Sequence, residues 1–99
     1  MAKIVFRQKA IDDLSDIWNY TVQEWSEKQA DHYYKLIQFG CNKIAQNTAA
    51  GKKYENINDA LFGLKSGKHI IFYQKISKDL IEIVRILHER MDLENRINE

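Results

Sequence analysis

The sequence predicts an α+β fold in which a helical hairpin packs on a small, mainly antiparallel sheet, in the order β-α-α-β-β-β. Residues 11–44 carry apolar side chains at three- and four-residue spacing, which is typical of amphipathic helices. Residues 61–88 instead contain three β-prone runs separated by short turns. The 99 residues include no proline and no visible repeat. We therefore expect a single domain spanning residues 1–99.

The first two elements follow from a change in pattern near residue 10. Ile4–Phe6 is a short β-prone run, which we expect to join the sheet as an edge strand. A helical stripe follows it, formed by Ile11, Leu14, Trp18, Val22 and Trp25. Three carboxylates fall in the expected first turns, where they suit the positive end of the helix dipole, and we expect them to be solvated: Asp12, Asp13 and Asp16.

A second helix is predicted to begin at Ser26. The order Ser26-Glu27-Lys28-Gln29 matches a capping box, in which the serine hydroxyl accepts from the Gln29 amide. The apolar stripe of this helix ends near Asn47, before Gly51, and consists of Ala30, Tyr33, Ile37, Cys41 and Ile44. Because almost no loop separates the two helices, they should form an antiparallel hairpin.

Three strands are predicted over residues 61–65, 69–76 and 80–88. In a regular final strand, one face would carry Ile81, Ile83, Arg85 and Leu87, and the other would carry Leu80, Glu82, Val84, Ile86 and His88. One face of the sheet must pack on the helical hairpin. A small open sheet also has exposed edges, and a groove is expected where the helices meet it.

Composition argues against several classes of function. The net charge is +1 and the sequence pI is near 7.8, whereas nucleic-acid-binding domains usually have a pI above about 9, so we expect no direct binding of nucleic acid. Residues 63–90 nevertheless hold six Lys or Arg against three Asp or Glu, which would attract an acidic partner.

Metal, cofactor and membrane roles also lack a sequence signal. The lone Cys41 is expected to be a small core residue, and three scattered histidines give no metal-ligand spacing, so we expect neither a metal nor a cofactor. No apolar run has the length of a signal peptide or a membrane span. We therefore expect a cytoplasmic protein.

Several motifs, in the same order along the chain, resemble those of ParE toxins. Residues 85–92, RILHERMD, resemble the signature that closes the sheet in this family. Residues 63–65 and 67–73, GLK and GKHIIFY, resemble its GLR and G-x-H-x-IFY patterns. Residues 10–18 resemble A-x-x-DL-x-x-IW, and residues 25–33 resemble W-x-x-x-QA-x-x-Y. The chain departs from the family at Asn47-Thr48, where Asn-Pro is common, and at Lys65, where arginine is usual.

The resemblance implies the toxic component of a type II toxin-antitoxin system. In this family a ParD-like antitoxin neutralises the toxin, the best-known target is DNA gyrase, and the toxin acts by binding rather than as an enzyme. The alternative is the other branch of the RelE and ParE superfamily, a ribosome-dependent messenger RNA endonuclease. A third reading is an inactive remnant, because Lys65 cannot make the planar, bidentate contact of an arginine.

The choice between enzyme and binder depends on a few residues. Arg85 and His88 would point to opposite faces of a regular strand, so without a bulge they could not converge on a substrate. Arg85 is equally well read as an inward-leaning side chain bonded to backbone or to a carboxylate such as Glu82. The histidines are more simply structural or surface residues. We therefore predict no catalytic residue, and the candidate partner contacts are Lys65, His69, Tyr73, Arg85, His88, Met91 and Asp92.

The C-terminal segment and the groove complete the expected binding surface. Residues 91–99 are expected to be a mobile element used in target recognition. An antitoxin tail would use both the exposed sheet edge and the groove between helices and sheet.

Overall fold

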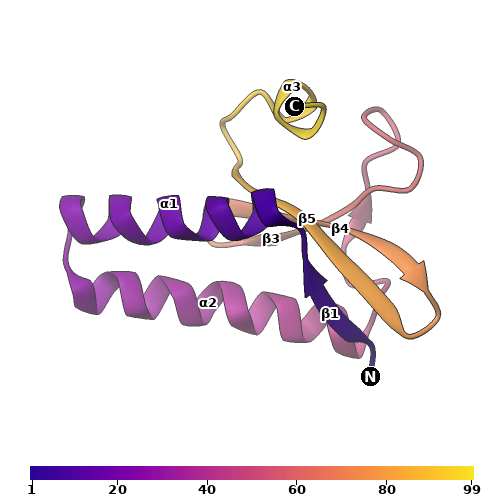
Figure 1. Ribbon diagram of the computed structural model, residues 1–99, viewed down its shortest axis with the longest axis horizontal. Helices are drawn as coiled ribbons and strands as arrows, with labels where there is room; N and C mark the ends of the chain where they lie inside the picture. The colour runs from indigo at the N-terminus through magenta and orange to yellow at the C-terminus, as the bar shows by residue number, and fades with distance from the viewer.

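The computed structural model describes residues 1–99 and contains a five-stranded sheet in the order β1-β5-β4-β3-β2 (Figure 1). In chain order the elements are β1 (Lys3–Phe6), α1 (Gln8–Glu24), α2 (Glu27–Gln46), β2 (Lys52–Lys53), β3 (Phe62–Ser66), β4 (His69–Ser77), β5 (Leu80–His88) and α3 (Leu93–Ile97). The α+β class and the predicted order are confirmed. β2 and α3 are additions that the sequence did not predict.

The helical hairpin forms as expected, and its joined end extends past the strands (Figure 1). Ser26 Oγ accepts a hydrogen bond from the Gln29 amide at 3.1 Å, which confirms this half of the capping box. α1 begins at Gln8, so no acidic residue lies in its first turn. The predicted role of Asp12, Asp13 and Asp16 beside the helix dipole is therefore wrong.

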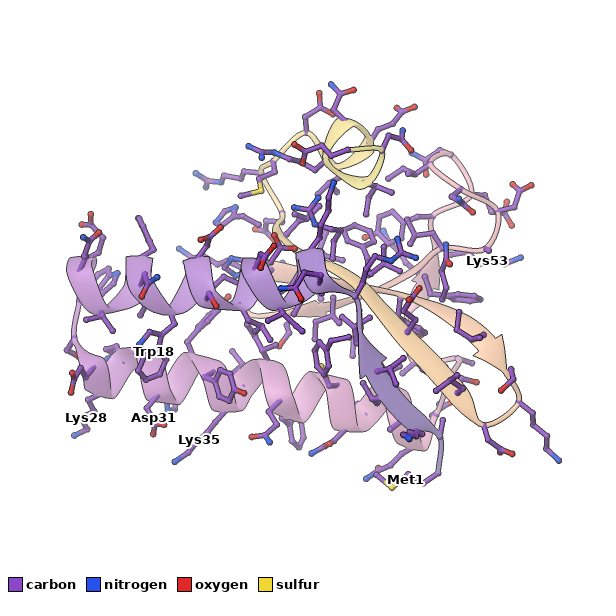
Figure 2. The ribbon with its side chains drawn as sticks, in the orientation of Figure 1. Met1, Trp18, Lys28, Asp31, Lys35 and Lys53 are labelled. Carbon is purple, nitrogen blue, oxygen red and sulfur yellow. The ribbon has the colours of Figure 1, made fainter.

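The side of α2 that faces away from α1 is mainly polar. Figure 2 shows Lys28, Asp31 and Lys35 pointing outward there, and Asp31 pairs with Lys35 at 3.1 Å. Trp18 of α1 packs edge-on against Tyr34 of α2, with ring centroids 6.5 Å apart. The two helices thus bury one side of the hairpin and leave the other to solvent. No helix combines the length and the apolar character that a bilayer crossing requires.

The sheet is antiparallel except for β1, which pairs in parallel with β5 at one edge, as the predicted edge strand. β5 contains a bulge, because Phe72 pairs with Arg85 while the next residue, Tyr73, pairs with Ile83. Val84 is the extra residue, and beyond it the alternation of side chains is inverted. The predicted faces of this strand are therefore wrong from Arg85 onward, whereas Val84 lies on its predicted face, opposite to Ile81 and Ile83.

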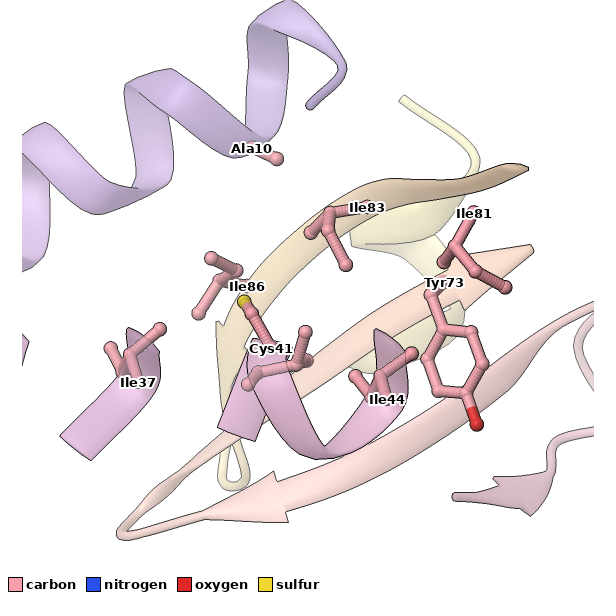
Figure 3. Close-up of a cluster of buried hydrophobic side chains, with 9 residues drawn as sticks. Ala10, Ile37, Cys41, Ile44, Tyr73, Ile81, Ile83 and Ile86 are labelled. Atoms are coloured by element: carbon pink, nitrogen blue, oxygen red, sulfur yellow. The ribbon is translucent and has the colours of Figure 1, made fainter. Parts of the chain in front are cut away.

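The sheet has an apolar core on each face. The core under the helical hairpin, shown in Figure 3, consists of Ala10, Ile37, Cys41, Ile44, Ile71, Tyr73, Ile81, Ile83 and Ile86. Packing of one face on the hairpin is thus confirmed, as is burial of Cys41. The opposite face carries Leu61, Ile70, Phe72, Val84 and Leu87, covered by the 54–57 segment and by Leu93 and Ile97 of α3. The segment expected to be mobile therefore includes a helix that packs on the sheet.

Candidate functional site

A groove of about 770 Å³ lies between the helical hairpin and the nearby ends of β4 and β5. We call it the helix–sheet groove, and it is lined by Asp16, Ile17, Tyr20, Thr21 and Trp25 of α1 and its C-terminus, Gln29 and Tyr33 of α2, and Lys68, His69, His88, Arg90 and Met91. Trp25 at the hairpin tip is 74% exposed. The groove predicted at the junction of helices and sheet is therefore present, and two large aromatic side chains, Trp25 and Tyr20, remain open to a partner.

The sheet end of the groove is formed by a pair of histidines. His69 of β4 and His88 of β5 lie directly opposite each other across the ladder, with ring centroids 5.3 Å apart. Tyr33 Oη lies 2.6 Å from His69 Nδ1 and accepts a hydrogen bond from the Lys68 amide at 2.9 Å. His88 Nδ1 accepts one from the Arg90 amide at 3.1 Å. These contacts fix both rings against their neighbours.

Local sequence explains why the hairpin between β3 and β4 brings His69 to this place. Gly67 has φ of 61°, a left-handed conformation that glycine adopts most readily. A Cβ at Gly67 would also lie 2.8 Å from the hydroxyl of Tyr33. The tight turn thus seats the strand hairpin against α2.

His69 should make stability depend on pH. Burial, followed by the nearby charge of His88, lowers the pKa of His69 from 6.5 to about 4. As pH falls, the unfolded chain therefore takes up a proton on His69 before the folded chain does. The contribution of the neutral His69 to the free energy of unfolding is complete above about pH 6.5 and is lost toward pH 4. We expect the free energy of unfolding, measured by urea denaturation, to fall across this window less steeply in His69→Gln than in the wild type. His32→Gln, at an exposed position, is the control. If the free energy of unfolding fell equally steeply with pH in the wild type and in His69→Gln, the pH dependence would not come from His69.

Three other predicted contacts remain, and two of them, Lys65 and Asp92, do not line the groove. Met91 lines the groove. Lys65 is exposed on β3 and pairs with Glu89 at 3.0 Å. Asp92 is the N-cap of α3 and accepts hydrogen bonds from the amide and the side chain of Asn95 at 3.4 Å and 2.6 Å. The roles of these residues as partner contacts stay predictions.

Tyr73 is a core residue with no exposed surface, so this structure offers a partner no access to it. Its hydroxyl donates to the Thr48 carbonyl at 2.9 Å and accepts from the Gly51 amide at 3.0 Å. Burial raises the pKa of this phenol. Tyr73 thus ties the loop after α2 to the sheet, which is a structural role rather than the predicted contact role.

Arg85 is also withdrawn from the surface, because only 8% of it is exposed. Its guanidinium bonds both carboxylate oxygens of Asp13, at 2.8 Å and 2.9 Å, and donates to the carbonyl of Arg96 at 2.7 Å and to Glu99 at 3.2 Å. The inward-leaning reading of Arg85 is therefore confirmed, but the suggested partner Glu82 is wrong, because Glu82 pairs with Arg7 at 2.6 Å.

Asp13 is not the solvated side chain that we expected. Besides Arg85, it accepts the amide of Ile86 at 2.9 Å, on the edge of β5 that β1 does not reach. This carboxylate thus completes the hydrogen bonding of an unpaired strand edge. Although the bulge inverts the alternation, Arg85 and His88 still do not converge, since Arg85 faces α1 and α3 while His88 lines the groove.

Tyr20, Lys68 and Arg90 line the groove but were not among the predicted contacts. The available signal for the two cations was their position in the chain, because Lys68 precedes His69 and Arg90 follows His88 by two residues. Tyr20 lies outside the predicted helical stripe, and an aromatic side chain on the polar side of a helix is itself a signal for binding.

Comparison with known proteins agrees with this architecture. The model of the family described as "ParE toxin of type II toxin-antitoxin system, parDE" matches residues 4–93. The chain is 31% identical over 84 residues to Toxin ParE1 of Mycobacterium tuberculosis (strain ATCC 25618 / H37Rv), covering 85% of this chain and 86% of that protein. It is 34% identical over 85 residues to Toxin ParE1 of Caulobacter vibrioides, covering 86% of each chain.

A solved structure shows the same fold. A chain of the chromosomal ParDE TA system from P. aeruginosa superposes with a TM-score of 0.75 at 20% identity, covering 89% of this chain and 96% of that one. The family match spans the helical hairpin and all five strands apart from the first residue of β1. The chain therefore belongs to the ParE family, as the toxin of a ParDE type II toxin-antitoxin system.

Proposed function

We propose that a ParD-like antitoxin neutralises the protein by binding in the helix–sheet groove, and that the free toxin inhibits DNA gyrase by protein binding, without catalysis. The observation that carries this proposal is the groove itself. It combines Ile17, Tyr20, Trp25 and Met91 with a basic end, and aromatic side chains beside such a groove are typical anchors for an amphipathic helix. Both partners would be met in the cytoplasm.

A sheet edge offers the antitoxin a second attachment. β2 pairs only with Phe62 and Gly63, so no strand covers the outer edge of β3 from Leu64 to Ser66. An extended segment that follows a docked helix would add a strand there. Groove and edge together would let one antitoxin tail bind two surfaces.

Binding to the product of the neighbouring reading frame tests the first half of the proposal. Trp25→Ala is expected to weaken the complex by about 2 kcal/mol, roughly thirtyfold, since exposed aromatic anchors dominate such interfaces. Phe39→Ala is the matched control, because Phe39 is 60% exposed on α2 but does not line the groove. Isothermal titration calorimetry would measure both. Equal affinities for the two variants would place the interface elsewhere.

A supercoiling assay with purified gyrase tests the second half. Inhibition should rise with toxin concentration, stay constant with incubation time, and disappear when antitoxin is added. A time-dependent loss at substoichiometric toxin would indicate catalysis. Unimpaired supercoiling at excess toxin would exclude gyrase as the target, and normal growth after induction would indicate an inactive copy.

The second candidate is a ribosome-dependent endonuclease. Its specific support is the meeting of two histidines with Lys68 and Arg90 at one end of the groove, since phosphodiester cleavage needs acid-base groups beside cations. Two observations weigh against it. Arg85 is held by Asp13 and α3, and a His69 pKa of about 4 makes this ring a weak base at neutral pH. Codon-linked cuts in primer extension on translated messages would favour this candidate over gyrase.

A further inference from the structure

The hydrogen bonds of His88 define which of its ring nitrogens carries the proton. Arg90 donates its backbone N–H to His88 Nδ1 at 3.1 Å, and a backbone amide has no acceptor role at its nitrogen. A neutral His88 must therefore use the Nδ1 lone pair as acceptor and hold its proton on Nε2.

The same tautomer follows for His69 from the position of Tyr33. The Tyr33 hydroxyl already accepts the Lys68 amide at 2.9 Å, and its own proton has two possible acceptors. His69 Nδ1 lies at 2.6 Å, whereas the Ser66 carbonyl lies at 3.5 Å, beyond an ordinary O–H···O bond. Burial raises the pKa of Tyr33, so the hydroxyl keeps that proton. His69 thus accepts at Nδ1 and carries its proton on Nε2.

Both Nε2–H groups are left to bind something outside the chain. Neither nitrogen has a hydrogen-bond partner within the protein, and no half-buried side chain hides an unpaired polar atom, so both reach solvent. The two rings meet edge-on across β4 and β5, with their planes at 79° and their centroids 5.3 Å apart, and both line the groove. These tautomers offer no Nε2 lone pair to a metal ion. They offer two adjacent donors to an acceptor.

The charges around the pair favour an anionic acceptor. Lys68 and Arg90 line the same end of the groove. The acidic neighbour Glu89 is engaged by Lys65 at 3.0 Å, and the acidic lining residue of the groove, Asp16, comes from α1. A carboxylate accepts at two oxygens, which suits two adjacent N–H donors backed by cations.

We infer that the sheet end of the groove, formed by His69, His88, Lys68 and Arg90, binds the carboxylate of an Asp or Glu side chain on the docked antitoxin helix. The apolar end receives the hydrophobic face of that helix, and the histidine donors fix its register. This inference rests on the proposed antitoxin binding, and it adds the side-chain chemistry that the antitoxin must supply.

The first test needs no antitoxin. Imidazole ¹⁵N resonances of the labelled protein report the tautomer of each ring, and each ring in its neutral form should carry its proton on Nε2. Acetate should then shift both Nε2 resonances in a saturable manner, and sodium chloride at equal ionic strength should not. Nδ1–H tautomers, or no response to acetate, would overturn the inference. A response to inorganic phosphate alone would assign the site to a phosphodiester instead.

The second test uses the antitoxin from the neighbouring frame. His88→Phe and His69→Phe should each weaken binding about tenfold, the loss expected for one hydrogen bond to a charged group. The His69→Gln and His88→Gln variants place an amide donor near the former position of Nε2, and they should regain most of the lost affinity. His32→Phe, on the exposed side of α2, is the control.

Two outcomes of this binding experiment separate the inference from the proposed function. Equal affinities for the Phe and Gln variants would overturn the inference while leaving antitoxin binding in place. Failure of the wild-type protein to bind the antitoxin would overturn the proposed function, and the acetate titration would then decide whether the histidine pair binds a carboxylate.

Discussion

Replacing Asp13 with alanine should lower the free energy of unfolding by about 3–5 kcal/mol, the usual cost of leaving one partner of a buried ion pair alone. The side chains of Asp13 and Arg85 are 11% and 10% exposed, and the carboxylate makes two bonds to the guanidinium. The variant would also leave the Ile86 amide without its acceptor. Urea denaturation with linear extrapolation would measure the loss.

Two variants make this expectation specific. Asp12→Ala removes an exposed carboxylate one residue away and should change stability by less than about 0.5 kcal/mol. The double variant Asp13→Leu with Arg85→Met should recover part of the loss, because an apolar pair of similar volume needs no desolvation of charge. Equal effects for Asp12→Ala and Asp13→Ala would show that the pair does not stabilise the fold.

Phe72→Ala should cost about 3–5 kcal/mol, the range observed when a fully buried phenylalanine is truncated. Phe72 has no exposed surface and packs edge-on against Tyr54, with ring centroids 5.1 Å apart. It lies on the face of the sheet that the 54–57 segment and α3 cover. Urea denaturation of this variant therefore measures how firmly the second core is packed.

The control for Phe72 is Ile76→Ala on the same strand. Ile76 is 53% exposed, so its truncation should cost less than about 1 kcal/mol. A loss at Phe72 no greater than that at Ile76 would mean that α3 and the 54–57 segment do not exclude water from this face.

Most of the fold could be predicted because its signals are local. The Ser26–Gln29 cap, the apolar spacing along both helices and the turn at Gly67 each act within a few residues. The predicted third strand matches β5 at both ends. By contrast, β2 consists of two lysines, which carry no strand propensity, and forms only because β3 lies beside it.

The site was harder to predict because its decisive contacts are distant in sequence. Asp13 and Arg85 are 72 residues apart, so no local pattern distinguishes Asp13 from its neighbour Asp12. The bulge at Val84 leaves no trace either, since β5 is apolar on both faces and its alternation is ambiguous. His69 and His88, in contrast, were both singled out, and the hairpin register brings them together.

The bulge in β5 also decides on which face of the sheet the side chains after Val84 lie. His88 follows Ile83 by five residues, an odd step, so an unbroken zigzag would turn its ring to the α3 side. Because Val84 is an extra residue in the ladder, the ring of His88 lies on the same face as Ile83, beside His69. The number of residues in this strand is thus constrained more tightly than their identity. Exchange of Val84 for an apolar side chain of similar volume should leave the groove in place, whereas deletion of Val84 would dismantle the binding surface although every groove residue remains in the sequence.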